Sequence, residues 1–417
     1  MIKRKLMEDI RKHLAKPEIT LIVGPRQAGK TTIMKALEEE LKRKGERTLY
    51  LNLDIEHDKE HFHSQTSLLR RIELEFGKNK GYVFIDEIQR KEDAGLFLKG
   101  IYDMNFPYKF IVSGSGSVEL KERIHESLVG RKRVFELLTL SFDEFINYKT
   151  GYKYEERLAD FFEIEQTKAF TLFEEYMNFG GYPRITLEEE LSEKLSLMNE
   201  IYQSYIERDI YYLLKIQKLP EFSKLVKFLA DSVGKTINLS EISTTIGVSL
   251  KTLKEYLWYL EKTFIVSKIT PFFRNLRKEL SKSPVYYFYD IGLRNFSIGE
   301  FGKVRDYSFI FQNFVYLVLL EKIKNTAFQI HFWRTKDKAE IDFVLDTGVS
   351  LLPVEVKYKR LKHPEIPRAL RSFMERYNPP EALIVNLSLY EKSLINNTEV
   401  ITIPFYKLID YRLQTVI

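Results

Sequence analysis

Eight residues near the N-terminus have types and spacing that suit the binding of nucleotide phosphates. Residues 24–31 read Gly-Pro-Arg-Gln-Ala-Gly-Lys-Thr and fit the pattern G-x-x-x-x-G-K-[ST]. In this pattern, backbone N–H groups turn toward phosphate oxygens, Lys30 reaches the β- and γ-phosphates, and the Thr31 hydroxyl binds Mg²⁺. A glycine turn that contains Lys-Thr by chance is the alternative, but a strand-like run before it and a helical pattern after it favour phosphate binding. The predicted phosphate-binding residues are Gly24, Pro25, Arg26, Gln27, Ala28, Gly29, Lys30, Thr31 and Thr32.

Two acidic residues end a second apolar run. In GYVFIDEIQ, residues 81–89, Asp86 is placed to hold Mg²⁺ through water and Glu87 to polarise the attacking water. Two solvated acids at a strand end are the alternative. A later run, YKFIVSGS, ends near Ser113, whose hydroxyl is predicted to sense the γ-phosphate, although a plain serine-rich loop explains it equally well.

A third set of candidate residues lies near the C-terminus. Residues 339–360, AEIDFVLDTGVSLLPVEVKYKR, read as two strands joined by a turn. Residues i and i+2 of a strand share a face, so Glu355 and Lys357 project together, and a hairpin brings Asp342 alongside. Two carboxylates and a lysine in this arrangement can hold one or two Mg²⁺ and position an attacking water. Charged side chains on the open face of a hairpin are the alternative.

The first two sets require a sheet that brings several strand ends together. Strand-like runs alternate with helical patterns through the N-terminal part of the chain, which is typical of a parallel α/β sheet. We therefore expect an α/β fold with a P-loop NTPase core over residues 1–150. Residues 151–235 carry Tyr, Phe and Leu at helical spacing and are predicted to form a helical lid on that core.

Residues 236–298 predict a winged helix-turn-helix. Two helical patterns are separated by the short turn IGVS and followed by a β run and a basic loop. In a DNA-binding version the second helix enters the major groove and the loop contacts the phosphate backbone. The alternative is a structural arm that packs on the nucleotide-binding domain. The predicted nucleic-acid contacts are Lys251, Lys254, Arg274, Arg277 and Lys278.

Residues 299–417 read as a helix, three strands, a helix and a strand, the core order of PD-(D/E)xK nucleases. This resemblance predicts a restriction-endonuclease-like α/β domain with Asp342 and Glu355 as metal ligands. Many such nucleases have a glutamate on the first helix, where this chain has Gln312, and a neutral amide is a poorer ligand for a hard cation. Glu340 shares a strand face with Asp342 and is expected to compensate in part. A working nuclease and a decayed fold used for binding both stay open.

The order of the motifs resembles that of AAA-related ATPases close to the STAND group of archaea and bacteria. After the phosphate loop come IDEIQ, SGS, LVGRKRV, NFGGYP, YYFYDIGLRN and PVEVKYK, so the resemblance covers nearly the whole chain. It implies an ATP-hydrolysing switch fused to an effector, with ATP and Mg²⁺ as cofactors. It also implies that Arg131 is an arginine finger in cis or in trans and that Pro183 packs on adenine, with Gly181 allowing close approach. A basic surface turn and a helix-ending turn are the respective alternatives.

Composition limits the remaining possibilities. The chain has 417 residues and no cysteine, which excludes disulfides, cysteine-ligated metals and thiol catalysis. No apolar run reaches the roughly 18 residues of a membrane helix, so we expect a cytoplasmic protein. A net charge of +6 permits a nucleic-acid partner without demonstrating one. Two functions compete: an ATP-driven enzyme acting on DNA, and a signalling or scaffold ATPase whose C-terminal domain binds a protein partner. An oligomer is compatible with both.

Overall fold

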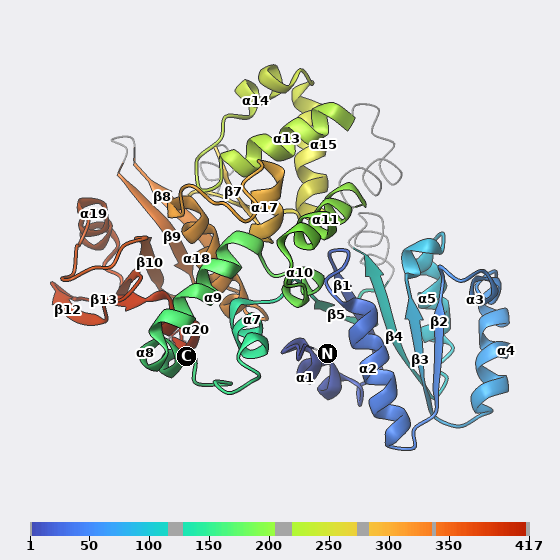
Figure 1. Ribbon diagram of the computed structural model, residues 1–417. Coiled ribbons are helices and arrows are strands. Elements are labelled where there is room, and N and C mark those ends of the chain that lie inside the picture. The colour runs from blue at the N-terminus through green and yellow to red at the C-terminus, as the bar shows by residue number, and fades with distance from the viewer. Residues whose placement is uncertain (1, 116–127, 205–218, 273–282, 336–338, 414–417) are drawn as a thin grey trace.

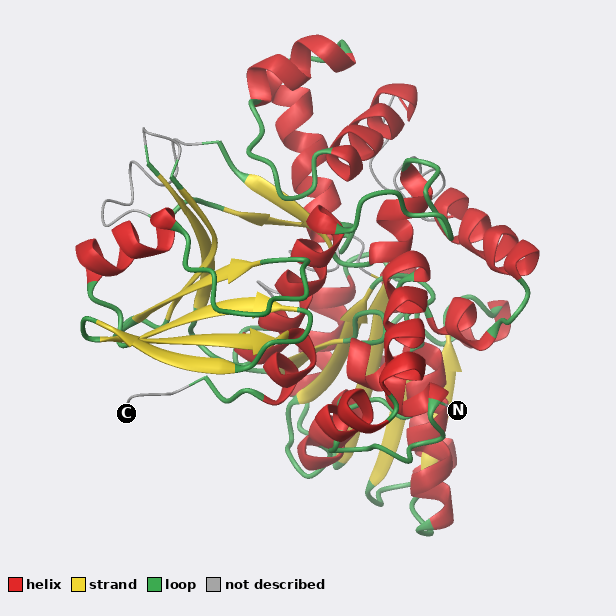
Figure 2. Cartoon of the chain, turned by 60° about the vertical axis from the view of Figure 1, so that its left-hand side comes forward, coloured by secondary structure: helices red, strands yellow, loops and turns green. Residues whose placement is uncertain are grey.

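The fold contains two large sheets and one two-stranded sheet, with helices between and around them (Figures 1 and 2). The computed structural model describes residues 2–115, 128–204, 219–272, 283–335 and 339–413. In Figure 1 the N-terminal sheet lies at the right, the C-terminal sheet at the left and α13, α14 and α15 at the top. Within the described residues, no helix is long and apolar enough to cross a membrane.

The N-terminal sheet is entirely parallel, with the strand order β2-β3-β4-β1-β5, and confirms the expected α/β core. β1 (Ile19–Gly24) and β3 (Gly81–Asp86) are buried along their whole length, as parallel strands covered on both faces must be. Because all strands run the same way, the carboxyl ends of β1 and β3 meet at one edge of the sheet. The other elements of this unit are α1 (Leu6–His13), α2 (Lys30–Arg43), β2 (Thr48–Asn52), α3 (Glu56–Glu60), α4 (Gln65–Phe76), η1 (Ile88–Arg90), α5 (Ala94–Asp103), β4 (Tyr108–Ser115) and β5 (Lys132–Glu136).

Helices follow the N-terminal sheet. Ser141 and Glu144 form a capping box that starts the first of them, α7, and Pro183 occupies the first turn of α10, where its missing N–H is not needed. These two caps fix where the chain enters each helix. The helices are α7 (Phe142–Lys149), α8 (Leu158–Ile164), α9 (Gln166–Phe179), α10 (Pro183–Leu187) and α11 (Leu191–Tyr202).

Three further helices and a strand pair form the next unit. Asn238 caps α14, Gly247 ends it in the left-handed conformation, and Ser249 caps α15. Thr236 bridges Val285 in an antiparallel sense, next to the β6–β7 pair. The elements are α13 (Leu219–Asp231), α14 (Leu239–Ile246), α15 (Leu250–Lys262), β6 (Val266–Ile269), β7 (Val285–Phe288) and α17 (Ile291–Ser297).

The C-terminal sheet has the strand order β12-β13-β11-β10-β9-β8. Its first three strands in the chain form an antiparallel meander, and α19 then crosses over to β11, which runs parallel to β10. Helix, three strands, helix and strand therefore occur in the expected order. The elements are α18 (Ser308–Ile323), β8 (Gln329–Arg334), β9 (Glu340–Asp346), β10 (Leu351–Val356), α19 (Arg368–Tyr377), β11 (Glu381–Asn386), β12 (Glu391–Ile395), β13 (Thr398–Pro404) and α20 (Phe405–Asp410).

Buried apolar side chains divide the chain near residue 140. Two clusters cover the two faces of the N-terminal sheet. One large cluster runs from Phe142 to Leu408 and joins the helices, the two-stranded sheet and one face of the C-terminal sheet. A fourth cluster lies between the C-terminal sheet and α19. The three units predicted after residue 150 therefore share one continuous core.

Candidate functional site

The predicted phosphate loop joins β1 to α2. Gly29 has φ +98°, a left-handed value that a side chain rarely adopts, and it directs the chain into the first turn of α2. The ammonium of Lys30 is buried and donates to the carbonyls of Gly24 (3.0 Å) and Pro25 (2.7 Å). Lys30 is thus held over the loop, within reach of an anion that the loop binds.

Three hydroxyl groups surround the buried carboxylate of Asp86. Thr31 Oγ1 and Tyr50 OH each donate to Oδ2 at 2.8 Å, and Ser113 donates to Oδ1. Burial and the nearby Asp86 carboxylate raise the pKa of Tyr50, so this phenol stays a donor. Hydroxyl and carboxylate oxygens are ligands that Mg²⁺ prefers, so Thr31 and Asp86 fit the expected ion.

The structure gives Ser113 a contact that sequence did not predict. Its side chain is completely buried, its hydroxyl donates to Asp86, and the N–H of Glu87 approaches its oxygen at 3.3 Å. A side chain committed to these contacts orients Asp86 and Glu87. These contacts also suit a positioning role for Ser113, and the expectation that its hydroxyl senses the γ-phosphate stays a prediction.

Glu87 is the predicted base for an attacking water. It lines the cavity beside the phosphate loop, its backbone is left-handed (φ 58°), and the amide of Gln89 donates to its carboxylate. A strained backbone of this kind occurs where a side chain must be aimed. Gln89 holds the carboxylate in place from the next turn.

A cavity of about 570 Å³ extends from the phosphate loop to the helices after residue 142. Pro183 and Arg184, at the start of α10, line its far wall. Arg184 donates to Gln27 of the loop at 3.2 Å and pairs with Glu200 of α11 at 3.2 Å. The predicted residues from both units thus meet at one cavity. Its lining includes Ile2, Arg4, Arg26, Gln27, Ala28, Gly29, Lys30, Thr31, Thr32, Asp54, Glu87, Arg90, Leu140, Pro183, Arg184 and Leu187.

Sequence reasoning missed Arg4, which also lines this cavity. Its guanidinium donates to the carbonyls of Ala28 (2.9 Å) and Leu138 (2.8 Å) and pairs with Glu144 at 2.9 Å, where both side chains are nearly buried. The residue ties the phosphate loop to the end of β5 and to α7. In the sequence Arg4 is one cation in a basic N-terminal run, and nothing there marks it.

Gly181 lies between α9 and α10 and makes a close contact with the backbone of Leu140. A Cβ atom there would lie 2.3 Å from the carbonyl oxygen of Leu140. The N–H of Leu140 donates to Gly181 O at 2.7 Å, and the N–H of Gly181 donates to Asp290 at 2.9 Å. The close approach that the sequence assigned to adenine is therefore an approach to the protein's own backbone.

Arg131 lies at the opposite end of the sheet from the phosphate loop. Its carbonyl accepts from the N–H of Ile19 at the start of β1, whereas the loop follows the last residue of β1. Five steps of about 3.3 Å separate these ends, or roughly 16 Å. Its guanidinium pairs with Asp103 at 2.6 Å. The prediction of an arginine finger in cis is therefore wrong, and a finger in trans stays a prediction.

The second candidate site lies on β9 and β10. Asp342 accepts from the amide of Gln312 (2.8 Å) and from the N–H of Val356 (2.7 Å). Burial and the neighbouring Glu355 raise the pKa of Asp342 to about 8. Gln312, which occupies the position of the expected helix glutamate, is thus hydrogen-bonded directly to the Asp342 carboxylate.

Glu355 and Lys357 share a strand face and form an ion pair of 2.6 Å. Burial raises the pKa of Glu355 against the opposing effect of Lys357, and within the described residues the buried Glu355 Oε2 atom has no hydrogen-bond partner. Glu340 lies on the same strand face as Asp342 and pairs with Arg334 (3.7 Å). In the described part of the chain, no group of three or more His, Cys, Asp or Glu could hold a metal. Asp342 and Glu355 therefore stay predicted metal ligands, as a pair of carboxylates and not as a group of three.

Two of the predicted nucleic-acid contacts can be placed. Lys251 and Lys254 are exposed on α15, the second helix of its pair. On its other side this unit packs against the N-terminal sheet, because Phe264, just after α15, belongs to that sheet's apolar cluster. The exposed α15 suits the DNA-binding alternative and the contact through Phe264 suits the structural arm, and both stay predictions. Arg274, Arg277 and Lys278 lie outside the described residues.

Comparison with protein families divides the chain into three parts. Residues 16–146 match the AAA domain. Residues 170–303 and 307–406 match two domains of unknown function (DUF8612 and DUF4143). The N-terminal sheet and its phosphate loop therefore form an AAA-related ATPase domain.

Relatives match over nearly the whole chain. The chain is 25% identical over 405 residues to an uncharacterized protein of Haemophilus influenzae, covering 95% of this chain and 94% of that one. It is 25% identical over 416 residues to an uncharacterized protein of Methanocaldococcus jannaschii, covering 96% and 90%. AMPPCP-bound DnaA from Aquifex aeolicus matches with 15% identity, 62% and 86% coverage and a TM-score of 0.32. Cdc6p from Pyrobaculum aerophilum matches with 13% identity, covering 75% of this chain and 96% of that one, with a TM-score of 0.28. Scores this low support no argument.

Proposed function

We propose that this protein binds and hydrolyses ATP with Mg²⁺ in the cavity between the AAA domain and α10. The observation that carries the proposal is the convergence of Lys30, Thr31 and Glu87 with Pro183 around one cavity. The cavity is open, and its size falls in the range of small-molecule and cofactor sites. Pro183 offers an apolar surface to the adenine ring of ATP.

The chain's own residues would divide the work as follows. Backbone N–H groups of residues 27–31 and Lys30 bind the phosphates, and bound Mg²⁺ neutralises the charge that develops on them. Thr31 and Asp86 hold that ion, and Tyr50 and Ser113 fix the orientation of the Asp86 carboxylate. Glu87 accepts the proton of the attacking water, with Gln89 holding its carboxylate.

The test measures phosphate release and nucleotide binding together. Lys30→Ala should abolish both, because it removes the cation that holds the phosphates. Glu87→Gln should keep ATP binding and lower the hydrolysis rate roughly 100-fold or more, the usual contribution of a general base. Ordinary turnover by the Lys30→Ala protein would overturn the proposal.

A second role concerns the C-terminal domain, which we propose to be nuclease-like and to act on DNA together with the winged-helix unit. Two observations favour it. The β8-β9-β10 meander, crossover helix α19 and parallel β11 follow the expected core order. Glu355 is near enough to raise the pKa of Asp342, and its buried Oε2 has no hydrogen-bond partner in the described part of the chain. Carboxylate oxygens are ligands for Mg²⁺. Lys357 would position the attacking water.

Cleavage is tested with purified protein on single-stranded, duplex, flap and four-way-junction DNA in Mg²⁺ or Mn²⁺. Asp342→Ala should abolish any cutting, and cutting that persists unchanged would indicate a contaminant. Intact DNA in every reaction would leave a binding role for this domain. If duplex binding is absent as well, the signalling or scaffold function with a protein partner takes its place.

A further inference from the structure

Basic residues are concentrated in the segment that directly follows Glu355. Residues 357–376 hold seven lysines and arginines against two glutamates, a net charge of +5 in 20 residues. The whole chain of 417 residues carries +6, so the rest of it is close to neutral. A charge gathered on one segment is the usual electrostatic signature of nucleic-acid binding.

This segment is firmly attached to the C-terminal sheet. Leu361, Leu370 and Phe373 are buried in the cluster between the sheet and α19. The N–H of Lys357 donates to Val385 at 2.8 Å, and the N–H of Leu387 donates to Lys359 at 3.1 Å. The cations are therefore presented by a rigid surface, which lowers the entropic cost of binding.

Three of the cations have no partner among the residues that the structure describes. Lys362, Arg368 and Arg371 are exposed, and within the described residues none of them takes part in an ion pair or a side-chain hydrogen bond. Two other cations of the segment do have partners on the protein. Lys359 pairs with Glu365 at 2.6 Å, and Arg360 lies 4.2 Å from the centre of the Phe170 ring.

The two arginines occupy an unfavourable place for the stability of α19. Arg368 and Arg371 lie at the start of the helix, where the macrodipole is positive, and no acidic residue lies in that first turn. Residues three apart on a helix share a face, so the two arginine side chains start from the same face of α19. A bound anion would relieve this repulsion and use the free N–H groups of the first turn.

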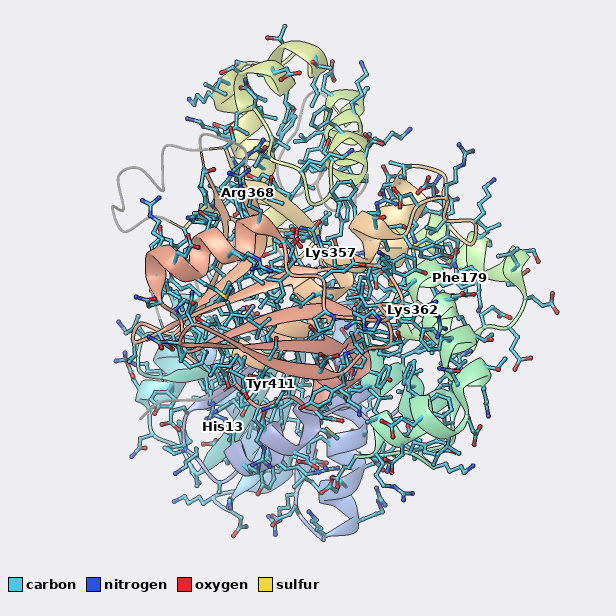
Figure 3. The ribbon with its side chains drawn as sticks, turned by 90° about the vertical axis from the view of Figure 1, so that its left-hand side faces the viewer. His13, Phe179, Lys357, Lys362, Arg368 and Tyr411 are labelled. Carbon is cyan, nitrogen blue, oxygen red and sulfur yellow. The ribbon has the colours of Figure 1, made fainter. Side chains whose placement is uncertain are left out.

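We propose that Lys362, Arg368 and Arg371 form a phosphate-contact surface that holds the backbone of duplex DNA beside Asp342, Glu355 and Lys357. Figure 3 shows Lys357, Lys362 and Arg368 on the side of the C-terminal sheet that faces the viewer. Tyr358 packs against Tyr307 and Phe311, and Phe373 is buried, so the segment offers charge without an exposed aromatic platform. Single strands are usually bound by stacking on such platforms, so a duplex fits better. The proposal rests on the proposed DNA role of this domain and names its contact surface.

The test compares two triple variants of the full chain by fluorescence anisotropy with a labelled duplex of about 25 base pairs, a length within the range of protein binding sites. Lys362→Ala, Arg368→Ala and Arg371→Ala are combined in one protein. The control combines Lys35→Ala, Arg70→Ala and Lys78→Ala, which are exposed cations of the AAA domain, and removes the same charge. Affinity should fall at least tenfold in the first protein and less than twofold in the second.

Salt titration and ATP hydrolysis separate the possible failures. The logarithm of the DNA-binding constant decreases as the logarithm of the salt concentration rises. This dependence should become shallower by up to about 2.7 in the first variant, at roughly 0.9 per lost phosphate contact. Hydrolysis without DNA should match wild type in both variants, so a fall there would indicate misfolding or a fault in the ATPase proposal. Equal losses in both variants, no loss in the first, or tighter binding to single strands would overturn the proposed surface. If duplex affinity falls only in a protein that combines Lys251→Ala with Lys254→Ala, the DNA role would stand and the phosphate contacts would lie on α15.

Discussion

The backbone N–H of Gly181 donates a 2.9 Å hydrogen bond to the carboxylate of Asp290, although 109 residues separate them in the chain. Gly181 lies two residues before Pro183 of the nucleotide cavity, and Asp290 caps α17 through the N–H of Leu293. Asn295 of α17 also donates to the carbonyl of Met177 in α9. Asp290 therefore joins the wall of the nucleotide cavity to the core of the C-terminal half.

Replacing Asp290 should damage both stability and nucleotide binding. Asp290→Ala leaves the buried N–H groups of Gly181 and Leu293 without acceptors, at about 1–3 kcal/mol each. We expect a lower midpoint of thermal unfolding and weaker ATP binding, measured by calorimetry and by a fluorescent ATP analogue. Asp290→Asn is the matched control, because its amide oxygen can still accept one of these bonds. Unchanged ATP affinity in a folded Asp290→Ala protein would contradict the proposed link.

Arg4 should control ATP affinity without touching the phosphates. Arg4→Ala removes the tie between Ala28 and Leu138 and leaves the nearly buried Glu144 without its cation, which typically costs 3–5 kcal/mol when a buried pair is broken. We expect the Kd for ATP to rise about tenfold, or roughly 1.4 kcal/mol. Arg4→Lys keeps the charge and loses the planar guanidinium with its several donors. The Kd of this variant for ATP should therefore lie between those of wild type and Arg4→Ala. The affinity is compared with the unfolding midpoint of the same proteins. A large drop in stability with an unchanged Kd would mean that Arg4 serves the fold alone.

Ser113→Ala distinguishes positioning of Asp86 from direct sensing of the γ-phosphate. The substitution removes a donor to Asp86 and an acceptor from the Glu87 N–H. If Ser113 positions Asp86, the Mg²⁺ concentration for half-maximal hydrolysis should rise several-fold, and the rate at saturation should fall about tenfold, near 1.4 kcal/mol. The preference for ATP over ADP should stay the same. A change in that preference with normal Mg²⁺ dependence would restore the sensing role. Ser113→Thr keeps the hydroxyl and serves as the control.

The parallel sheet and the phosphate-binding residues were predictable because they depend on local pattern: a buried strand, a glycine loop and a helix in succession. Tyr50 and Arg4 were not, because both act through tertiary contacts with residues far along the chain. Arg131 was misplaced for a related reason. A glycine followed by an arginine is a local sequence pattern that suits an arginine finger. The direction of β5, however, decides at which end of the sheet the arginine lies. Strand direction is a property of the whole sheet and is not encoded in the local motif.

The raised pKa of Asp342 predicts how stability changes with pH. At pH values below its usual pKa of 3.8 the carboxyl is protonated in both folded and unfolded chains. Between there and about 8 the folded protein keeps a proton that the unfolded chain has lost, so the free energy of unfolding falls as the pH rises. Asp342→Asn removes this titration. In EDTA, its unfolding midpoint should exceed that of wild type by several degrees at pH 8, and the difference should shrink toward pH 5.

A bound cation should reverse this effect, since it favours the ionised carboxylates of Asp342 and Glu355. Adding Mg²⁺ or Mn²⁺ at pH 8 should therefore raise the unfolding midpoint of wild type and leave that of Asp342→Asn unchanged. Asp346→Asn is the matched control on the same strand, because Asp346 caps the hairpin turn through the N–H of Gly348 and lies outside the carboxylate pair. Parallel pH profiles for wild type and Asp342→Asn would contradict the raised pKa. A metal response that persists in Asp342→Asn would place the cation elsewhere on the protein.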